Sequence, residues 1–145
     1  MILFINTSLA DLTAIKLIEQ GRVAQTLEDH RLFKQAEILL PFIDKLLQKG
    51  KIKKEQLNAL AIVSGPGGFS SLRLGITTAN ALASTLKIPL IEITADEALT
   101  AEDLLKAISS KAKKILQQKN KVFKPVVPQY GQEPNITVKK EWFCP

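Results

Sequence analysis

The chain has 145 residues, 46% of them hydrophobic and only 6% aromatic, which indicates one domain with an aliphatic core. Its single cysteine, Cys144, excludes a disulfide framework and favours a reducing cytoplasm as the place where the protein works. The opening residues MILFINTS carry no basic leader and are far too few to cross a bilayer. They predict a strand rather than a signal peptide or a membrane anchor.

The net charge of +6 is concentrated after residue 100. Eleven basic and ten acidic residues precede that point, whereas nine lysines and four acidic residues follow it. A basic tail could contact RNA. Because no nucleic-acid motif accompanies these lysines, a solvated helix face followed by a soluble tail is the favoured interpretation.

The first part of the chain predicts an antiparallel meander. Residues 2–7, 13–18 and 22–28 are expected to form strands, and Gly21 lies at the centre of the turn between the last two.

A helical pattern follows over about residues 34–49. Gly50 occupies the position just past a helix where glycine is favoured. Pro41 lies inside the pattern and predicts either a kink or the start of a second segment. The apolar residues fall on one stripe: Ala36, Leu39, Leu40, Ile43, Leu46 and Leu47.

The second part of the chain alternates strands with helices. Strands are expected over residues 58–64 and 88–94, and helices over about 70–86 and over 95–118, the latter in one or two pieces. From Asn120 onward, four prolines and a glycine predict an extended tail. The order β-β-β-α-β-α-β-α indicates an α/β fold in which helices pack on a mixed sheet.

Common catalytic arrangements are missing from the sequence. The one histidine, His30, lies in the charged stretch LEDHR, which favours an exposed side chain. A Ser-His-Asp site would need it as the base, and no serine lies in a G-x-S-x-G elbow. One histidine and one cysteine, far apart, also make an ordinary zinc or iron site improbable. A carboxylate site for magnesium is the open alternative, but no acidic cluster at close spacing favours it, so no metal site is expected.

The glycine-rich loop before the helix at 70–86 matches neither phosphate-binding signature. No lysine follows Gly68 as a P-loop requires, and Ser70 stands where the dinucleotide fingerprint has its third glycine. A nucleotide or anion contact could still use loop amides at the helix N-terminus, where Ser70 or Ser71 could act as the cap. A tight reversal of the chain is slightly favoured over that contact. The candidate contact residues are Gly65, Gly67, Gly68, Ser70 and Arg73.

The helix over 70–86 carries no charge between Arg73 and Lys87, whereas a surface helix normally has a charged face. Such a helix is either internal or packed against another chain. Burial on all sides is hard to arrange in a short chain, which favours a protein interface, with an internal helix covered by the tail as the alternative. The interface would use the apolar stripes of both helices: Leu39, Ile43, Leu46, Leu72, Ile76, Ala79 and Ala83.

Several stretches, taken in order, resemble the TsaB family. SGPGGFSSLRLGITTANALA resembles the family's long glycine-loop signature, and ILFINTS resembles its opening strand. LLPFIDKLL resembles a family helix with an internal proline, and IPLIEITADEALTA resembles the strand and helix that follow. The likeness covers roughly residues 1–100, and VVPQYGQEPNITVKK, residues 126–140, resembles the family's closing segment.

The resemblance implies an ASKHA fold, the α/β fold of actin-like and Hsp70-like proteins. Residues 1–100 would form its ribonuclease-H-like first lobe, with a mixed β-sheet. Residues 101–145 would be a remnant of the second lobe, a helix plus an extended basic tail, with most of that lobe missing.

The resemblance also implies a role in making threonylcarbamoyladenosine in tRNA. TsaB-like proteins are regarded as non-catalytic subunits that bind the catalytic subunit TsaD, which transfers threonylcarbamoyl to adenosine 37, and the ATPase TsaE joins the complex. A homodimer through the same helices is an alternative assembly. No cofactor of its own is expected, although ATP or ADP could lie at a shared subunit interface. The rival functions are a nucleotide- or tRNA-binding module and a glycoprotease-like peptidase.

Two departures from the family pattern point away from catalysis. Asn6 stands where the family opening has an aspartate, which in ASKHA ATPases helps to place the metal of the nucleotide. Gln35 stands where relatives carry a histidine, and the catalytic subunit has a metal-binding histidine pair in this helix. Gly68 and Ser71 also stand where relatives usually have serine and glycine.

Overall fold

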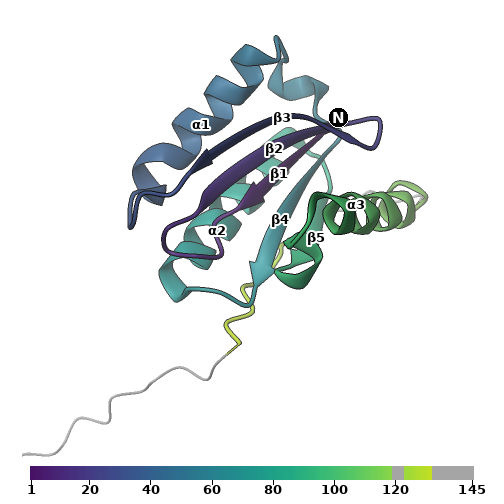
Figure 1. Ribbon diagram of the computed structural model, residues 1–145. Coiled ribbons are helices and arrows are strands. Elements are labelled where there is room, and N and C mark those ends of the chain that lie inside the picture. The colour runs from purple at the N-terminus through teal and green to yellow at the C-terminus, as the bar shows by residue number, and fades with distance from the viewer. Residues whose placement is uncertain (119–122, 132–145) are drawn as a thin grey trace, which may run out of the picture.

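The computed structural model describes residues 1–118 and 123–131. Five strands form one sheet in the order β3-β2-β1-β4-β5, with helices on both faces (Figure 1). The strands are β1 (Ile2–Asn6), β2 (Thr13–Glu19), β3 (Arg22–Asp29), β4 (Ala59–Gly65) and β5 (Leu90–Thr94). The helices are α1 (Gln35–Lys49), α2 (Phe69–Leu86) and α3 (Ala101–Leu116), with short 3₁₀ helices η1 (Lys54–Gln56) and η2 (Asp96–Ala98).

The centre of the sheet is formed by β1 and β4, which run parallel and pair Phe4 with Ala61. β2 is antiparallel to both of its neighbours, β1 and β3. All seven residues of β4 are buried, because helices cover both of its faces. This is the continuous apolar run that parallel strands need. The mixed α/β sheet and its element order are therefore confirmed.

Two apolar layers hold the helices on the sheet. α1 and α2 pack on one face around Ile5, Ile15 and Ile62. α3 packs on the other face against Phe4, Ile91 and Ile93 through Leu104, Ile108 and Ala112. α3 is therefore part of the same folded body as residues 1–100, and the expected boundary at residue 100 does not separate it from the first lobe.

The sequence located most element boundaries to within two residues. The helical region 95–118 does fall in two pieces, η2 and α3, and the Thr100 hydroxyl caps α3 by accepting from the Asp103 amide at 3.0 Å. Pro41 starts no second segment, because α1 continues through it and leaves it exposed.

Two expected helix ends differ in detail from the structure. Gly50 follows α1 but has φ −78°, and the left-handed residue is Lys51. The N-cap of α2 is Gly68 with no side-chain cap, so neither Ser70 nor Ser71 caps the helix. The Ser71 hydroxyl instead donates to the Gly68 carbonyl at 3.2 Å. No helix in the described parts of the chain combines the length and apolar character needed to span a bilayer.

Candidate functional site

The glycine loop packs tightly against the chain that leaves β1. The Gly68 amide donates to the Ser8 carbonyl at 2.8 Å, and a Cβ at Gly67 would lie 2.3 Å from the same oxygen. In α2, a Cβ at Gly75 would lie 2.1 Å from the Thr7 Oγ1 atom. These glycines allow two backbone segments to approach closely. The Gly68 amide already has a partner within the chain.

The first turn of α2 presents a stack of three side chains. The Phe69 and Tyr130 rings stack with centroids 4.6 Å apart, and the Arg73 guanidinium lies 5.1 Å from the centre of the Phe69 ring. Both the stacking and the cation–π contact are favourable. Of the expected anion contacts, Ser70 and Arg73 are exposed and Gly65 is buried.

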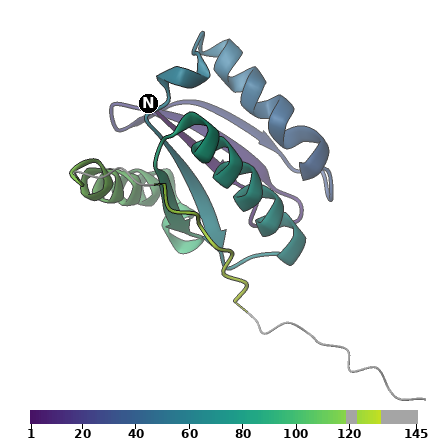
Figure 2. The same ribbon diagram turned by 180° about the vertical axis from the view of Figure 1, so that it is seen from behind.

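Residues 123–131, which we call the strap, return from the far side of the sheet and run beside α2 (Figure 2). The Gln129 amide donates to the Ser64 carbonyl at 2.7 Å. A Cβ at Gly65 would lie 2.0 Å from the Gln129 carbonyl oxygen, and Gly65 has φ +134°. The strap thus covers the exit of β4 and helps to fix the glycine loop.

The seven predicted interface side chains are not at the surface. Each is at most 3% exposed, because these stripes face the sheet of their own chain. The assignment to an interface is therefore corrected: a hydrophobic period shows which side of a helix is covered, not which chain covers it. The seven are Leu39, Ile43, Leu46, Leu72, Ile76, Ala79 and Ala83.

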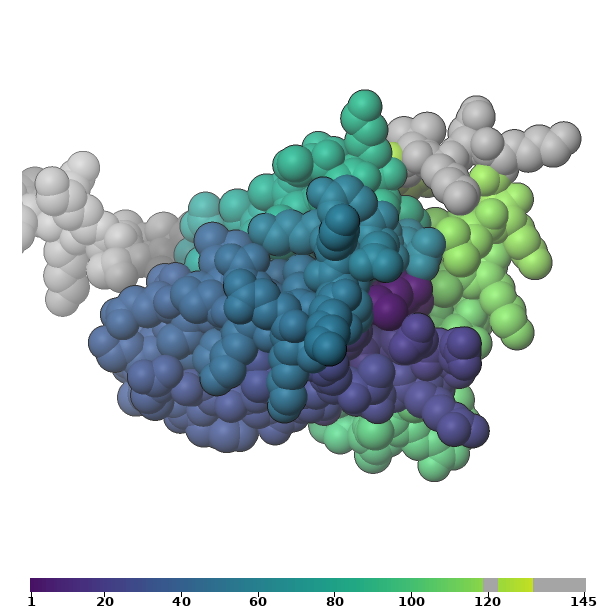
Figure 3. Space-filling model, turned by 90° about the horizontal axis from the view of Figure 1, so that it is seen from above, coloured from purple at the N-terminus to yellow at the C-terminus, as the bar shows by residue number. Residues whose placement is uncertain are grey.

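The exposed surface of α2 is the side opposite its buried stripe. Ser70, Thr77, Ala81 and Ser84 are exposed there, and no charged residue lies between Arg73 and Lys87. The exposed surface of α1 adjoins that of α2, so the two helices share one face of the molecule (Figure 3). We call the exposed, uncharged residues Thr77, Ala81 and Ser84, which follow Arg73 in the helix, the outer face of α2.

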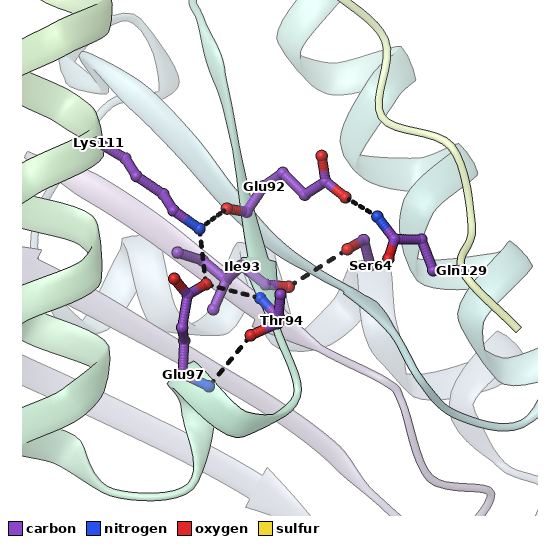
Figure 4. Close-up of polar contacts among 7 residues, drawn as sticks. All are labelled: Ser64, Glu92, Ile93, Thr94, Glu97, Lys111 and Gln129. Atoms are coloured by element: carbon purple, nitrogen blue, oxygen red, sulfur yellow. Dashed lines mark hydrogen bonds and ion pairs between the residues drawn. The ribbon is translucent and has the colours of Figure 1, made fainter. Parts of the chain in front are cut away.

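A polar network joins the end of β5 to α3 and to the strap (Figure 4). The Lys111 ammonium donates to Glu97 Oε2 at 2.6 Å and to the Glu92 carbonyl at 2.8 Å. Burial raises the pKa of Glu97, but the hydrogen bonds from Lys111 and from the Thr94 amide outweigh this effect and leave that pKa below its ordinary value. The Gln129 side chain donates to the Glu92 carboxylate at 2.7 Å.

The positions relevant to catalysis are used for structure. Gln35 is buried, and its amide donates to the carbonyls of Leu9 and Leu12, which fixes the β1–β2 loop on α1. The Asn6 side chain accepts from the Ser8 amide at 3.0 Å. The His30 side chain is 68% exposed, and its nearest carboxylate, Glu28, is 3.9 Å away. Within residues 1–118 and 123–131, no group of three or more His, Cys, Asp or Glu side chains could hold a metal.

Comparison with known proteins identifies the family of this chain. Residues 34–122, more than half of the chain, match the family model described as TsaD: tRNA N6-adenosine threonylcarbamoyltransferase. The chain belongs to the TsaD family. It is 30% identical over 107 residues to the tRNA N6-adenosine threonylcarbamoyltransferase of Protochlamydia amoebophila, covering 63% of this chain and 31% of the relative. It is 33% identical over 86 residues to the tRNA threonylcarbamoyladenosine biosynthesis protein TsaB of Buchnera aphidicola, covering 53% and 38%.

Among solved structures, YeaZ from Pseudomonas aeruginosa has a TM-score of 0.61 and 26% identity to the chain. The alignment covers 64% of this chain and 43% of that one. This TsaD-family chain is thus TsaB/YeaZ-like, as the glycine-loop signature indicated, and it spans only about a third of the transferase's length.

The contacts of the strap were missed in the sequence. Asn80, Gln129 and Tyr130 carry no periodicity that marks them as partners, and the strap binds mainly through its backbone. The sequence offered two signals, the likeness of residues 126–140 to the family's closing segment and the alternative in which the tail covers the helix at 70–86. Neither signal predicts which residues make the contacts.

Proposed function

We propose that this chain acts in the biosynthesis of threonylcarbamoyladenosine in tRNA, as a non-catalytic TsaB-like subunit that binds a TsaD-like catalytic subunit in the cytoplasm. The observation that carries the proposal is the outer face of α2. It combines exposure with an absence of charge over several turns, which suits close packing of a partner helix. The relatives named for this pathway support the choice of partner.

The absence of catalysis in this proposal rests on Gln35 and Asn6. A histidine at residue 35 could offer a ring nitrogen to a metal. The side-chain amide of Gln35 instead donates hydrogen bonds to two backbone carbonyls. The Asn6 side chain likewise accepts from its own loop. The catalytic groups would then come from the TsaD-like subunit.

The proposal also extends to the other expected components of the assembly. A TsaE-like ATPase would join through the catalytic subunit, and a second copy of this chain would compete for the outer face of α2. ATP or ADP held at the shared interface would meet this chain at Arg73, which is exposed in the first turn of α2. The Gly68 amide would not contribute, because it donates to Ser8.

The experiment combines the full chain with the TsaD-like and TsaE-like proteins of the same genome. Size-exclusion chromatography should show co-elution with the TsaD-like subunit, and threonylcarbamoyl transfer to unmodified tRNA should require the chain. A complex that fails to form, or transfer at full rate without the chain, would refute the proposal. Threonylcarbamoyl transfer by the chain alone would refute the non-catalytic assignment.

A further inference from the structure

One face of α3 is rich in side chains that are cationic or can donate a neutral hydrogen bond. These residues are exposed and line a shallow groove between α3 and the β2–β3 turn at Gly21. Glu102 and Leu105, nearer the start of α3, line the same groove. The acidic residues of α3 lie in its first turn, at Glu102 and Asp103. We call the following set the donor face: Lys106, Ser109, Ser110, Lys113, Lys114 and Gln117.

Most of the charge on the donor face is available to a ligand. Among the described residues, Lys113 and Lys114 form no ion pair, whereas Glu102 is 2.7 Å from Lys106. Lys111, on another side of α3, is bound to Glu97. Lys114 also lines a second groove, along β5, together with Lys124 of the strap and with Glu92.

The donor face is held rigidly on the body of the protein. Leu104, Ile108 and Ala112 anchor the opposite side of α3 in the core. Lysines near a helix C-terminus are expected from the helix dipole alone. That effect does not account for Ser109 and Ser110, which lie between Lys106 and Lys113, so that no carboxylate stands between these two lysines on the face.

We propose that the donor face of α3 contacts the sugar–phosphate backbone of tRNA. The proposal rests on the proposed function, which makes tRNA the substrate of the complex, and it assigns a tRNA contact to this subunit. Lysine, serine and glutamine are side chains that typically bind phosphate oxygens. Lys106 and Lys113 are two helical turns apart, about 10 Å along the axis, so they can reach different phosphates of one strand. An anionic bilayer fits less well, because Leu116 is the one large apolar side chain exposed on α3 in the described part of the chain.

The test measures binding of unmodified tRNA to the full chain by fluorescence anisotropy over a series of salt concentrations. The variant Lys113→Glu/Lys114→Glu should bind about tenfold more weakly near physiological salt, and its log Kd against log salt should be shallower by roughly 2. Lys45→Glu/Lys49→Glu is the matched control, because it makes the same charge change near the end of α1, on the opposite face of the sheet. The milder pair Lys113→Gln/Lys114→Gln guards against loss of folding, which circular dichroism monitors.

A selective loss of tRNA binding in the α3 variants supports the proposal. Equal losses in the α1 and α3 variants would overturn it, because net charge alone would then explain binding. Unchanged tRNA binding in both α3 variants would overturn it too, as would tighter binding to phosphatidylserine vesicles than to tRNA. Co-elution of the same variants with the TsaD-like subunit is measured separately. If the tRNA-binding test overturns the role of the donor face while the variants still co-elute with the TsaD-like subunit, the proposed function is unaffected.

Discussion

Asn80 of α2 and Val126 of the strap exchange two hydrogen bonds, each 2.9 Å long. The side-chain amide of Asn80 donates to the Val126 carbonyl, and its oxygen accepts from the Val126 amide. Val126 itself is only 7% exposed. A single side chain thereby satisfies the backbone of an irregular segment, as a neighbouring strand would.

Asn80→Leu should release the strap. The substitution keeps the size of the side chain but removes both bonds and leaves two backbone groups unpaired, at a cost of about 1–3 kcal/mol. Hydrogen exchange should show a faster Gln129 amide, and the free energy of unfolding in urea should fall. Ser84→Ala, on the exposed side of the same helix, is the control and should change neither. An unaltered Gln129 amide in Asn80→Leu would mean that the strap is held by other contacts.

Gly75→Ala should destabilise the protein by about 1–3 kcal/mol, because the added methyl would lie 2.1 Å from Thr7 Oγ1. A double-mutant cycle identifies the cause. Thr7→Ala removes the obstructing oxygen, so the double variant should lose less stability than the two single variants together. Thr7→Val keeps the volume of the side chain and should therefore not reduce the destabilisation caused by Gly75→Ala. Strict additivity with Thr7→Ala would place the strain elsewhere.

Gly67→Val should cost more than Arg73→Ala. The Ser8 carbonyl faces Gly67 and is bonded to the Gly68 amide, so it cannot move aside easily. Gly67 does not have a positive φ, so crowding rather than backbone conformation is the reason. Arg73 is exposed, and its loss removes only the contact with Phe69. Thermal melts decide, and a larger shift for Arg73→Ala would show that the stack, not the loop, stabilises this end of α2.

The sequence predicted a helix or strand well where each face of that element lies in a single environment, either the apolar core or solvent. Apolar periodicity located α1 and α2, and the unbroken run in β4 marked a strand covered on both sides. The same periodicity could not show that Ala79 and Ile76 face their own sheet, because a partner chain would impose the same pattern. The low charge of α2 lies on its other, exposed side, where the sequence placed no interface residue.

The site was less predictable because its contacts join segments far apart in sequence and involve backbone atoms. The approach of Ser8 to Gly67, and of the Gln129 carbonyl to Gly65, depends on how loops cross the ends of β1 and β4. No side-chain pattern encodes a carbonyl position. The glycines indicated that another segment of the chain approaches the loop closely, but they did not indicate which segment.

The Glu97–Lys111 pair should make stability depend on pH in the acid range. The pKa of Glu97 is lower in the folded chain than its ordinary value. Its contribution is therefore present above the unfolded pKa and is lost as pH falls through the folded pKa. Glu97→Gln should lower the melting temperature at pH 7. It should also make the melting temperature fall less steeply as the pH is lowered to about 3, which is below the ordinary pKa of a glutamate. Glu102→Gln is the control, since its pair with Lys106 is exposed. Identical acid profiles for Glu97→Gln and the parent would contradict the assignment.

Ala79→Glu and Ala81→Glu form a matched pair that separates core from interface. The two positions are two residues apart in α2, but Ala79 is fully buried and Ala81 is exposed. A carboxylate at residue 79 would be buried without a partner, at a cost of several kcal/mol. Ala79→Glu should therefore lose its cooperative melt, whereas Ala81→Glu should melt like the parent.

Ala81→Glu should instead weaken binding to the TsaD-like subunit, because the new charge would be buried in the contact. Each 1.4 kcal/mol of lost binding energy is tenfold in Kd, so a weakening of about tenfold or more is expected by calorimetry. Ser109→Glu makes a similar neutral-to-acidic change on α3, on the far face of the sheet, and should leave this affinity unchanged. If Ala81→Glu binds as tightly as the parent while Ser109→Glu does not, the partner lies against α3 and the outer face of α2 needs another explanation.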